Sequence, residues 1–458
     1  MNLIFVCVFC NKEYLKLLYL LLESIYLYGN LKRNIKILIY TSTDFKNIIK
    51  KSNMYDKQWT LFETNDNYTN VTLACKARLD LFELETIRSG KFNRILYLDT
   101  DILIKNDINH VFDLPSKDLI YAIEEGKIDD NRDYYGVSLF RHQELDPHRG
   151  KPAFSSGVML FKNCQAVKSL FEVIKRDIIN RPREFSCHDQ PYIVYHAFRT
   201  GLFDNQTIKA SAVNNDLNIY SNKTIHHFPG NTGVYYNKFL EMNQFLFSLK
   251  DQMVCSYLDQ TKSYIDRYLM QIIERSGEPL EGNVLTEHET TRYYPPYENK
   301  AKNIISIAAN GKIKNVLEIG FGSGFSSLLM LMANETLKVT SIDWMKHKYV
   351  EPCYEQIKSR FGDRIELIKE DSDVALENLF GSYDLIHIDG SIFTEIVESD
   401  ILHSIRLSSE TIIILDDYDY QHIHDLWNKY TNKYKLRDLD SILYPTNGHS
   451  IKWIPKRK

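Results

Sequence analysis

The sequence lacks a long hydrophobic run, and this absence argues against a membrane-spanning segment. No stretch reaches the roughly 18 uninterrupted apolar residues that a membrane helix needs. The apolar N-terminal stretch Leu3–Phe9 also lacks the basic flank of a signal peptide, so it is predicted to be a first buried strand. Any association with a membrane is therefore expected to be peripheral.

The chain also lacks a strong excess of charge of either sign. Its net charge of −4 gives no general attraction to nucleic acid or to a membrane surface. No internal repeat or low-complexity segment is present. We therefore expect no nucleic-acid partner.

Cysteines are few, and their spacing is not that of a disulfide framework. The seven cysteines are an odd number and are scattered along the chain, which is typical of reduced thiols in a cytoplasmic protein. Cys7 and Cys10 form a lone C-x-x-C in or just after the first apolar run. We expect neither a redox nor a zinc role for this pair.

What the sequence does contain indicates a globular α/β protein of two or three domains. Its 458 residues exceed one ordinary domain, and 44% hydrophobic with 25% charged residues supply ample core material. Apolar stretches at Leu3–Phe9 and Ile35–Tyr40 flank a helical pattern over Tyr14–Tyr28, and a further helix is predicted over Thr72–Ser89. This alternation of strand and helix is typical of the α/β class.

The domain boundary is predicted near residues 245–265. The pattern from Asn237 to Ser276 is helical, and Gly277–Gly282 and Pro295–Pro296 then interrupt it. We therefore predict one domain over residues 1–250 and a second over residues 262–458.

The stretch Ile95–Ile104 carries two carboxylates, Asp99 and Asp101, at the end of a predicted buried strand. Two uncompensated carboxylates at the edge of a core would cost on the order of several kcal/mol. The carboxyl end of a parallel strand is also where open α/β sheets place their ligands. This favours a divalent cation that holds a nucleotide diphosphate, although helix-capping or turn aspartates are the ordinary alternative.

Four other segments of this half carry candidate binding residues. Asn11–Tyr14 follows the first strand, where a ligand base could stack on the tyrosine ring. Phe154–Phe161 is a small-residue turn that leads into a strand, His188–Gln190 opens a helical pattern, and Ile225–Gly230 contains two histidines. Taken singly, each has a structural alternative: a stacking core tyrosine, a packing glycine, a helix cap, or a buried or surface histidine.

Together and in this order, the segments resemble family 8 glycosyltransferases, the glycogenin and lipopolysaccharide galactosyltransferase group with a GT-A fold, over about residues 1–240. The resemblance implies retaining transfer of a hexose from a UDP-sugar to a glycan or glycoprotein acceptor, with Mn²⁺ or Mg²⁺. The implied metal ligands are Asp99, Asp101 and His227. The implied nucleotide-sugar-binding residues are Asn11, Tyr14, Lys76, Ser155, Gly157 and Gly230. The implied residues around the reacting centre are Arg78, Asp189 and Gln190.

The chemistry of this reaction suits those residues. Cleavage of the bond between the anomeric carbon and the diphosphate develops negative charge on the departing phosphate. A metal and a basic side chain such as Arg78 would stabilise that charge. Because no clear nucleophile is present, we favour a short-lived oxocarbenium-like ion pair.

Two positions depart from the family pattern. Ser155 stands where the family has a sugar-contacting asparagine, which shortens the reach toward the donor. The family's K-P-W lysine is missing, because Gly233–Tyr235 stands in its place. Lys238 is the nearby candidate to replace that lysine; otherwise reduced activity is expected.

The second half contains a glycine-rich motif, Val316–Gly324, between a predicted strand and a helix over Phe325–Ala333. The next strand, Lys338–Asp343, ends in an acid 19 residues after the last glycine, which is a nucleotide-binding fingerprint. Three further strands that end in acids are predicted at Ile365–Ile368, Asp384–Ile388 and Thr411–Leu415. A hairpin is predicted from Tyr434–Leu439 and His449–Trp453.

The glycines alone leave a nicotinamide-binding Rossmann domain open. With the acids and the hairpin, however, residues 280–458 resemble class I S-adenosylmethionine-dependent methyltransferases. The implied cofactor-binding residues are Glu318, Gly320, Gly322, Gly324, Asp343, Asp371 and Ser372. The positions of Asp389, Asp416 and Asp417 resemble the metal ligands of metal-dependent O-methyltransferases, although a structural role for the last two is the alternative. The histidine of the related D-G-D-H motif is absent, which leaves His387 or His422 as the candidate base.

The whole sequence therefore predicts a bifunctional glycan-modifying enzyme. The first domain would add a sugar and the second would methylate a hydroxyl of the glycan, with fusion raising the local concentration of the intermediate. The alternative is that one domain is degenerate and only binds glycan or nucleotide. A non-enzymatic nucleotide-sensing scaffold is the least favoured interpretation, because both sites keep most of their acids.

Overall fold

The computed structural model describes residues 1–215, 220–229, 235–441 and 443–455. The chain divides into two compact units, Met1–Lys50 with Met54–Leu246, and Lys51–Asn53 with Phe247–Lys458. The division falls inside helix α9 (Tyr235–Tyr264).

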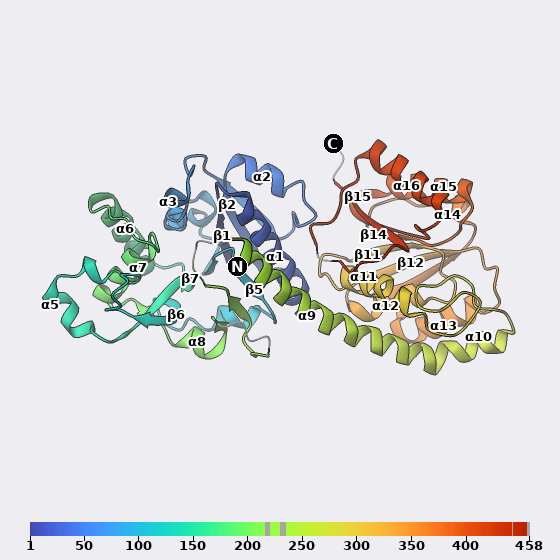
Figure 1. The fold of residues 1–458 in the computed structure, drawn as a ribbon, viewed down its shortest axis with the longest axis horizontal. Coiled ribbons are helices and arrows are strands. Elements are labelled where there is room, and N and C mark those ends of the chain that lie inside the picture. The colour runs from blue at the N-terminus through green and yellow to red at the C-terminus, as the bar shows by residue number, and fades with distance from the viewer. Residues whose placement is uncertain (216–219, 230–234, 442, 456–458) are drawn as a thin grey trace. The chain divides into compact units, whose positions relative to one another are not determined.

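The first unit, blue to green in Figure 1, is built on a seven-stranded sheet with the order β3-β2-β1-β4-β7-β6-β8. Strands β1 to β4 are mutually parallel, and β7 runs antiparallel to both of its neighbours, β4 and β6. The strands are β1 (Asn2–Val8), β2 (Ile35–Thr41), β3 (Thr60–Thr64), β4 (Arg94–Leu98), β6 (Ile120–Lys127), β7 (Pro152–Lys162) and β8 (Phe203–Asp204). A second, three-stranded sheet contains β5 (Ile102–Ile104), β10 (Ile225–His227) and β9 (Val213–Asn214).

Apolar side chains on both faces of the seven-stranded sheet pack against helices, as expected for buried parallel strands. Helix α1 begins after Asn11, whose side chain accepts a hydrogen bond from Glu13 N. The longer helices are α1 (Lys12–Tyr28), α6 (Gln165–Asn180) and α7 (Gln190–Thr200). The shorter ones include α2 (Thr43–Ile49), α3 (Val71–Ala74), η1 (Ala77–Glu83), α4 (Glu85–Arg88), α5 (His142–Leu145) and α8 (Thr207–Ser211).

The predicted continuous helix over Thr72–Ser89 is wrong. That segment contains α3, the 3-10 helix η1 and α4, with Leu84 in an extended conformation before α4. The residues from Ala77 to Phe82 are all buried, including two charged side chains, Arg78 and Asp80. An amphipathic α-helix keeps one face in solvent, whereas this short turn must bury side chains in every direction.

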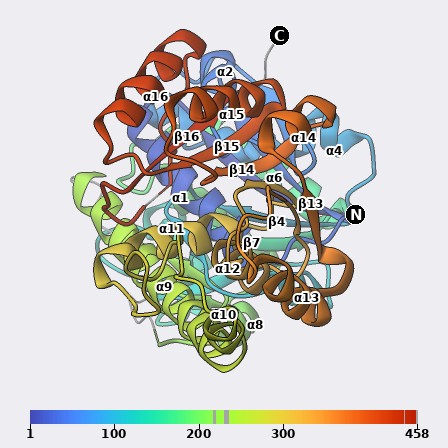
Figure 2. The ribbon, with the colours of Figure 1, turned by 90° about the vertical axis from the view of Figure 1, so that its right-hand side faces the viewer.

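The second unit, yellow-green to red in Figure 2, contains a six-stranded sheet with the order β13-β12-β11-β14-β15-β16, in which only β16 is antiparallel to its neighbour. Helices α14 to α16 cover one face, and α11 to α13 lie against the other. The strands are β11 (Asn315–Ile319), β12 (Lys338–Asp343), β13 (Ile365–Lys369), β14 (Tyr383–Ile388), β15 (Ser408–Asp416) and β16 (His449–Ile454). The helices include α10 (Met270–Ser276), α11 (Glu298–Ala308), α12 (Phe325–Ala333), α13 (Val350–Phe361), α14 (Ser372–Asn378), α15 (Thr394–Arg406) and α16 (Gln421–Tyr434).

The predicted C-terminal hairpin is only partly correct. Strand β16 forms and pairs antiparallel with β15, but Tyr434–Leu439 is not a strand because α16 continues to Tyr434. Only an isolated bridge joins Arg437 to Trp453.

The hydropathy of the helices and the state of the cysteines can be compared with what the sequence predicts. Among the helices in the described ranges, none combines the length and the hydropathy that a membrane crossing requires. All seven cysteines lie in the described ranges, and all are free thiols.

Candidate active sites

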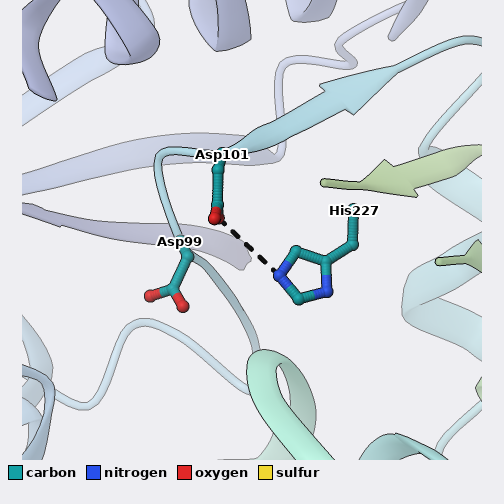
Figure 3. Close-up of side chains that lie close together, drawn as sticks. All are labelled: Asp99, Asp101 and His227. Carbon is teal, nitrogen blue, oxygen red and sulfur yellow. Dashed lines mark ion pairs between the residues drawn. The ribbon is translucent and has the colours of Figure 1, made fainter. Parts of the chain in front are cut away.

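The first site forms where β4 and β10 end. Asp99 and Asp101 lie in the turn between β4 and β5, and β10 pairs antiparallel with β5 so that His227 faces Ile102. This pairing brings His227 Nε2 to 3.7 Å from Asp101 Oδ1 (Figure 3). One ligand atom from each of Asp99, Asp101 and His227 lies within 4.8 Å of the others. The three predicted metal ligands are therefore brought together.

Three observations show that this group suits a cation. Asp101 Oδ1 is buried, and within the described ranges it has no hydrogen-bond partner. His227 Nδ1 contacts Asn215 Oδ1 at 3.1 Å, while Nε2 faces the acid. Gly157 keeps the space open, because a Cβ at that position would lie 2.7 Å from His227 Nε2 and 3.1 Å from Asp99 Oδ2.

The surroundings shift the pKa values of Asp99 and Asp101 in opposite directions. Burial raises the pKa of Asp99 to about 6; Arg78 opposes this rise and Asp101 adds to it. Burial also acts to raise the pKa of Asp101, but Lys238 and His227 outweigh it and the pKa is lowered. Lys238 Nζ lies 2.5 Å from Asp101 Oδ2, so the lysine proposed from the sequence does reach this site.

Arg78 is fixed by a buried ion pair. Its Nε and Nη2 donate to Asp189 Oδ2 at 2.7 Å and to Asp189 Oδ1 at 2.6 Å. Its Nη1 donates to the carbonyl oxygen of Ser156 at 2.8 Å and lies 3.6 Å from Asp99 Oδ1. Asp189 is fully buried, and both of its oxygens bind the guanidinium, so it positions Arg78.

Gln190 closes the same network. Its Oε1 accepts from Ser156 N at 2.9 Å and from Ser156 Oγ at 3.1 Å, and its Nε2 donates to Tyr134 O at 3.3 Å. Ser155 is buried, and its Oγ accepts from Gly157 N at 3.3 Å. The small-residue segment of β7 thus joins α7 to the acids.

The remaining predicted nucleotide-sugar residues lie in other segments. Asn11 caps α1, Tyr14 packs against the apolar core, and Lys76 is half-buried just before η1. Gly230 lies outside the described residues.

Two residues of this site were missed by sequence reasoning. The hydroxyl of Tyr97 donates to Asp99 Oδ1, and its ring centre lies 5.2 Å from Arg78 Cζ. The spacing of two along β4 was a usable signal, because side chains two apart share a face of a strand. Glu125 on β6 is the second: burial raises its pKa, while Ser155 and Arg132 oppose the rise.

In the second unit, Asp343 organises the glycine-rich loop. Its Oδ2 accepts from Phe321 N at 3.1 Å and from Gly322 N at 2.8 Å, and its Oδ1 accepts from Met345 N at 2.7 Å. Burial raises its pKa, and these amide donors oppose the rise. Gly320 has a φ of +94°, and a Cβ there would lie 2.2 Å from Asp389 O, so this position requires glycine.

Other predicted cofactor residues have structural partners as well. Glu318 is fully buried and accepts from Ser326 Oγ at 2.6 Å, from Ser341 Oγ at 2.7 Å and from Ser327 Oγ. Asp371 caps α14 and accepts from Asp373 N at 3.1 Å, and Ser372 is the first residue of that helix. Gly324 has a φ of +76° and precedes α12.

Strand alternation brings Glu318, His387 and Asp416 to one face of the sheet. Glu318 pairs with His387, and Asp416 lies two residues beyond the Ile414 that pairs with His387, so all three point the same way. The group whose ligand atoms lie within 4.8 Å of one another is His387, Asp389 and Asp416. Within the described residues Asp417 is not part of that group, although it was predicted as a ligand. Its backbone N–H donates to Asp416 Oδ1 at 2.9 Å.

A lysine already occupies this group. Lys300 Nζ lies 2.5 Å from Asp416 Oδ1. Burial acts to lower the pKa of Lys300, but Asp416 and Asp389 outweigh it and the pKa is raised. Burial, together with the neighbouring acids, raises the pKa of Asp389 well above its usual value and that of Asp417 to about 6. An ammonium group therefore already neutralises Asp416, and a dication at this group would have to compete with it.

The two candidate bases differ in exposure. His387 is fully buried, and no described residue forms a hydrogen bond with either ring nitrogen. His422 is exposed, and its Nε2 contacts Ile392 O at 2.9 Å. Only His422 is therefore open to solvent in this structure.

Comparison with known proteins agrees with this division into two sites. Residues 6–199 match the model of glycosyl transferase family 8, and residues 317–418 match a methyltransferase domain model. No match to a curated protein sequence was found.

Solved structures similar to the two units were found at low identity. The bifunctional glycosyltransferase WbbM is 13% identical with a TM-score of 0.39, and the match covers 54% of this chain and 49% of that one. The galactosyltransferase LgtC is 14% identical with a TM-score of 0.38, covering 54% of this chain and 96% of that one. A putative caffeoyl-CoA O-methyltransferase from Staphylococcus aureus is 16% identical with a TM-score of 0.34, covering 45% and 98%.

The two family models cover separate parts of the chain, and each covers one of the acidic sites described above in part or whole. Asp99 and Asp101 lie within the first match, and Asp389 and Asp416 lie within the second. The chain is therefore an enzyme with an N-terminal family 8 glycosyltransferase domain and a C-terminal methyltransferase domain.

Proposed function

We propose that the N-terminal domain transfers a hexose from a UDP-sugar to a glycan or glycoprotein acceptor, with retention and with dependence on Mn²⁺ or Mg²⁺. We further propose that the C-terminal domain uses S-adenosylmethionine to methylate a hydroxyl group of the glycan. The observation that carries the first part is the buried Asp101 Oδ1, which has no hydrogen-bond partner among the described residues and faces His227 Nε2. We also infer a cytoplasmic location, which the seven free thiols support.

In the first domain, the chain's task is to hold the departing diphosphate. A cation bound by Asp99, Asp101 and His227 would stabilise the developing negative charge. Arg78 adds a buried positive charge. Its guanidinium group is oriented by hydrogen bonds to Asp189 and to the Ser156 carbonyl oxygen. We propose that Lys238 replaces the missing family lysine and pairs with the diphosphate, because its ammonium already reaches Asp101.

In the second domain, the glycine-rich loop and Asp343 are proposed to hold S-adenosylmethionine, which supplies an activated methyl group. Asp343 has a double role in this proposal, since it orders the loop through two amides and would accept from the ribose. Asp371 and Ser372 are proposed to border the adenine.

One observation favours the alternative that a domain only binds its ligand. In each site a lysine ammonium lies 2.5 Å from a carboxylate oxygen. Lys238 Nζ contacts Asp101 Oδ2 in the first site, and Lys300 Nζ contacts Asp416 Oδ1 in the second. A cation must compete with that ammonium. Thermal shift of the purified protein with UDP-sugars plus Mn²⁺, and separately with S-adenosylmethionine, tests both domains for binding, and product formation then separates an enzyme from a binding module.

Replacing Asp343 with alanine is expected to weaken S-adenosylmethionine binding by about 1.5–3 kcal/mol, the worth of hydrogen bonds to a charged group. The loss combines the proposed ribose contact with disorder of the loop that Asp343 holds. Calorimetry measures the change. Asp363→Ala, an acid in the turn before β13, is the matched control and should bind normally. Binding of a nicotinamide dinucleotide in place of S-adenosylmethionine would refute the methyltransferase assignment of this pocket.

The two domains are expected to act in sequence on one glycan. A newly added sugar supplies the hydroxyl groups that the second domain would methylate. The protein is incubated with donor and acceptor, labelled S-adenosylmethionine is added, and the product is followed by mass spectrometry. Methylation should appear only after sugar transfer and should disappear in Asp101→Asn. Methylation of the bare acceptor at the same rate would rule out this order.

A further inference from the structure

Helix α11 places one buried cation among the acids of the second sheet. Lys300 Nζ lies 2.5 Å from Asp416 Oδ1, and the two side chains are only 5% and 2% exposed. Nζ also lies 4.6 Å from the centre of the Tyr297 ring. The contact neutralises a carboxylate that burial would otherwise leave without compensation.

A glycine makes room for the Lys300 side chain. A Cβ at Gly448 would lie 2.9 Å from Lys300 Cδ, so the absence of a side chain there makes room for the lysine stem. Asn303, one turn further along α11, lies 3.1 Å from His449 Nε2 and donates to Tyr444 O at 2.9 Å. These contacts hold α11 against the start of β16. Lys300 is therefore fixed along its stem as well as at its charged end.

The lysine of the first site is less confined. Lys238 is 19% exposed, compared with 5% for Lys300. It binds Asp101 Oδ2, while Asp101 Oδ1 has no hydrogen-bond partner among the described residues. In the second site, Asp416 Oδ1 receives both Lys300 and the N–H of Asp417. The ion pair of the second site is therefore almost completely buried, with side chains 5% and 2% exposed, whereas that of the first site is partly open to solvent, with side chains 19% and 15% exposed.

We propose that Lys300 is the resident cation of the second site and stands in place of the divalent metal that the acids were predicted to hold. The inference rests on the proposed methyltransferase function. Lys300 acts as a positioning residue: it fixes Asp416, and Asp416 fixes the backbone of Asp417 at the ligand edge of the sheet. A divalent ion at Asp416 would meet the ammonium at short range and be repelled. Methyl transfer is therefore metal-independent in this protein.

The test removes the charge and asks whether a metal takes its place. All proteins carry Asp101→Asn, so that the first site does not bind Mn²⁺. Binding of Mn²⁺ is followed by electron paramagnetic resonance, and its effect on the melting temperature is recorded. The Lys300→Met variant keeps the stem without the charge. Lys302→Met is the control, because Lys302 lies on the same helix but pairs with Glu298 at 3.2 Å near the surface.

With Lys300 intact, and in the Lys302→Met control, we expect no Mn²⁺ binding and no thermal shift. In Lys300→Met we expect one bound Mn²⁺ and a rise in melting temperature on its addition, since the freed acids recruit another cation. One Mn²⁺ bound with Lys300 intact would overturn the proposal. No gain of binding in a folded Lys300→Met protein would overturn it as well.

A second measurement needs no variant and decides the matter if Lys300→Met does not fold. The wild-type protein is given a purified, already glycosylated acceptor and S-adenosylmethionine, with and without a chelator. Methyl transfer at an unchanged rate in the chelator supports the proposal, and loss of transfer overturns it. Calorimetry with S-adenosylmethionine keeps the two hypotheses apart: absence of binding refutes the methyltransferase function, whereas the Mn²⁺ measurement still decides the role of Lys300.

Discussion

Replacing Asp101 with asparagine is expected to reduce hexose transfer by a factor on the order of 10³ while leaving the fold intact. The change removes one anionic ligand from the proposed cation, and a Lewis-acid contribution of several kcal/mol corresponds to that factor. The Asp101 side chain is 15% exposed and borders solvent, so its neutral isostere should not disturb the core. Release of UDP from a UDP-sugar in the presence of Mn²⁺ measures the activity, and circular dichroism during heating checks the fold.

The matched control is Asp113→Asn. Asp113 also carries an ion pair, with Arg94 at 2.9 Å, but its side chain is 77% exposed and lies away from the acids. This variant should retain full transfer. The metal assignment is refuted if Asp101→Asn turns over at the wild-type rate and the wild-type enzyme keeps its rate in a chelator.

Replacing Arg78 with methionine is expected to abolish transfer and to lower the free energy of unfolding by about 3–5 kcal/mol, the usual cost of breaking a buried ion pair. Asp189 is fully buried, and both of its oxygens depend on Arg78. Without the guanidinium, a carboxylate is left in the core with no compensating charge. Urea unfolding followed by fluorescence measures the loss.

A double variant separates stability from catalysis at this position. Arg78→Met with Asp189→Asn removes both charges, so much of the lost stability should return, but transfer should not. Lys209→Met is the control for an exposed pair, since Lys209 and Glu124 lie 2.7 Å apart with side chains 46% and 25% exposed. It should cost no more than about 1 kcal/mol. Full activity in the double variant would contradict the role proposed for Arg78.

The strands and their acidic ends could be predicted because each strand carries its own signal. The stretch Lys338–Asp343 is β12, and Phe325–Ala333 is α12, as their apolar patterns indicated. The meeting of Asp99 and Asp101 with His227 also followed from the resemblance, and the pairing of β5 with β10 supplies its physical basis. Such features depend on local periodicity and on the shared edge of a sheet.

Contacts between distant segments could not be predicted in the same way. Arg78 meets Asp189 across 111 positions, and no local pattern marks that partnership. Lys300 lies on a helix whose sequence shows an ordinary amphipathic pattern, and only the fold reveals that one of its lysines faces inward to Asp416. The continuous helix predicted over Thr72–Ser89 was wrong for the same reason. Whether a short segment is completely buried depends on the elements that pack around it and not on its own sequence pattern.

Helix α9 sets how the gene can be divided for separate expression of the two domains. Its first part supplies Lys238 to Asp101 and buries Met242 and Leu246 in the first unit. Its later part contributes Val254 and Leu258 to the apolar core of the second. Cutting the gene before α9 would deprive the first domain of a charged partner, and cutting after it would deprive the second domain of core residues. Stable fragments should therefore each carry their own copy of α9, with the segment duplicated in the two expression clones.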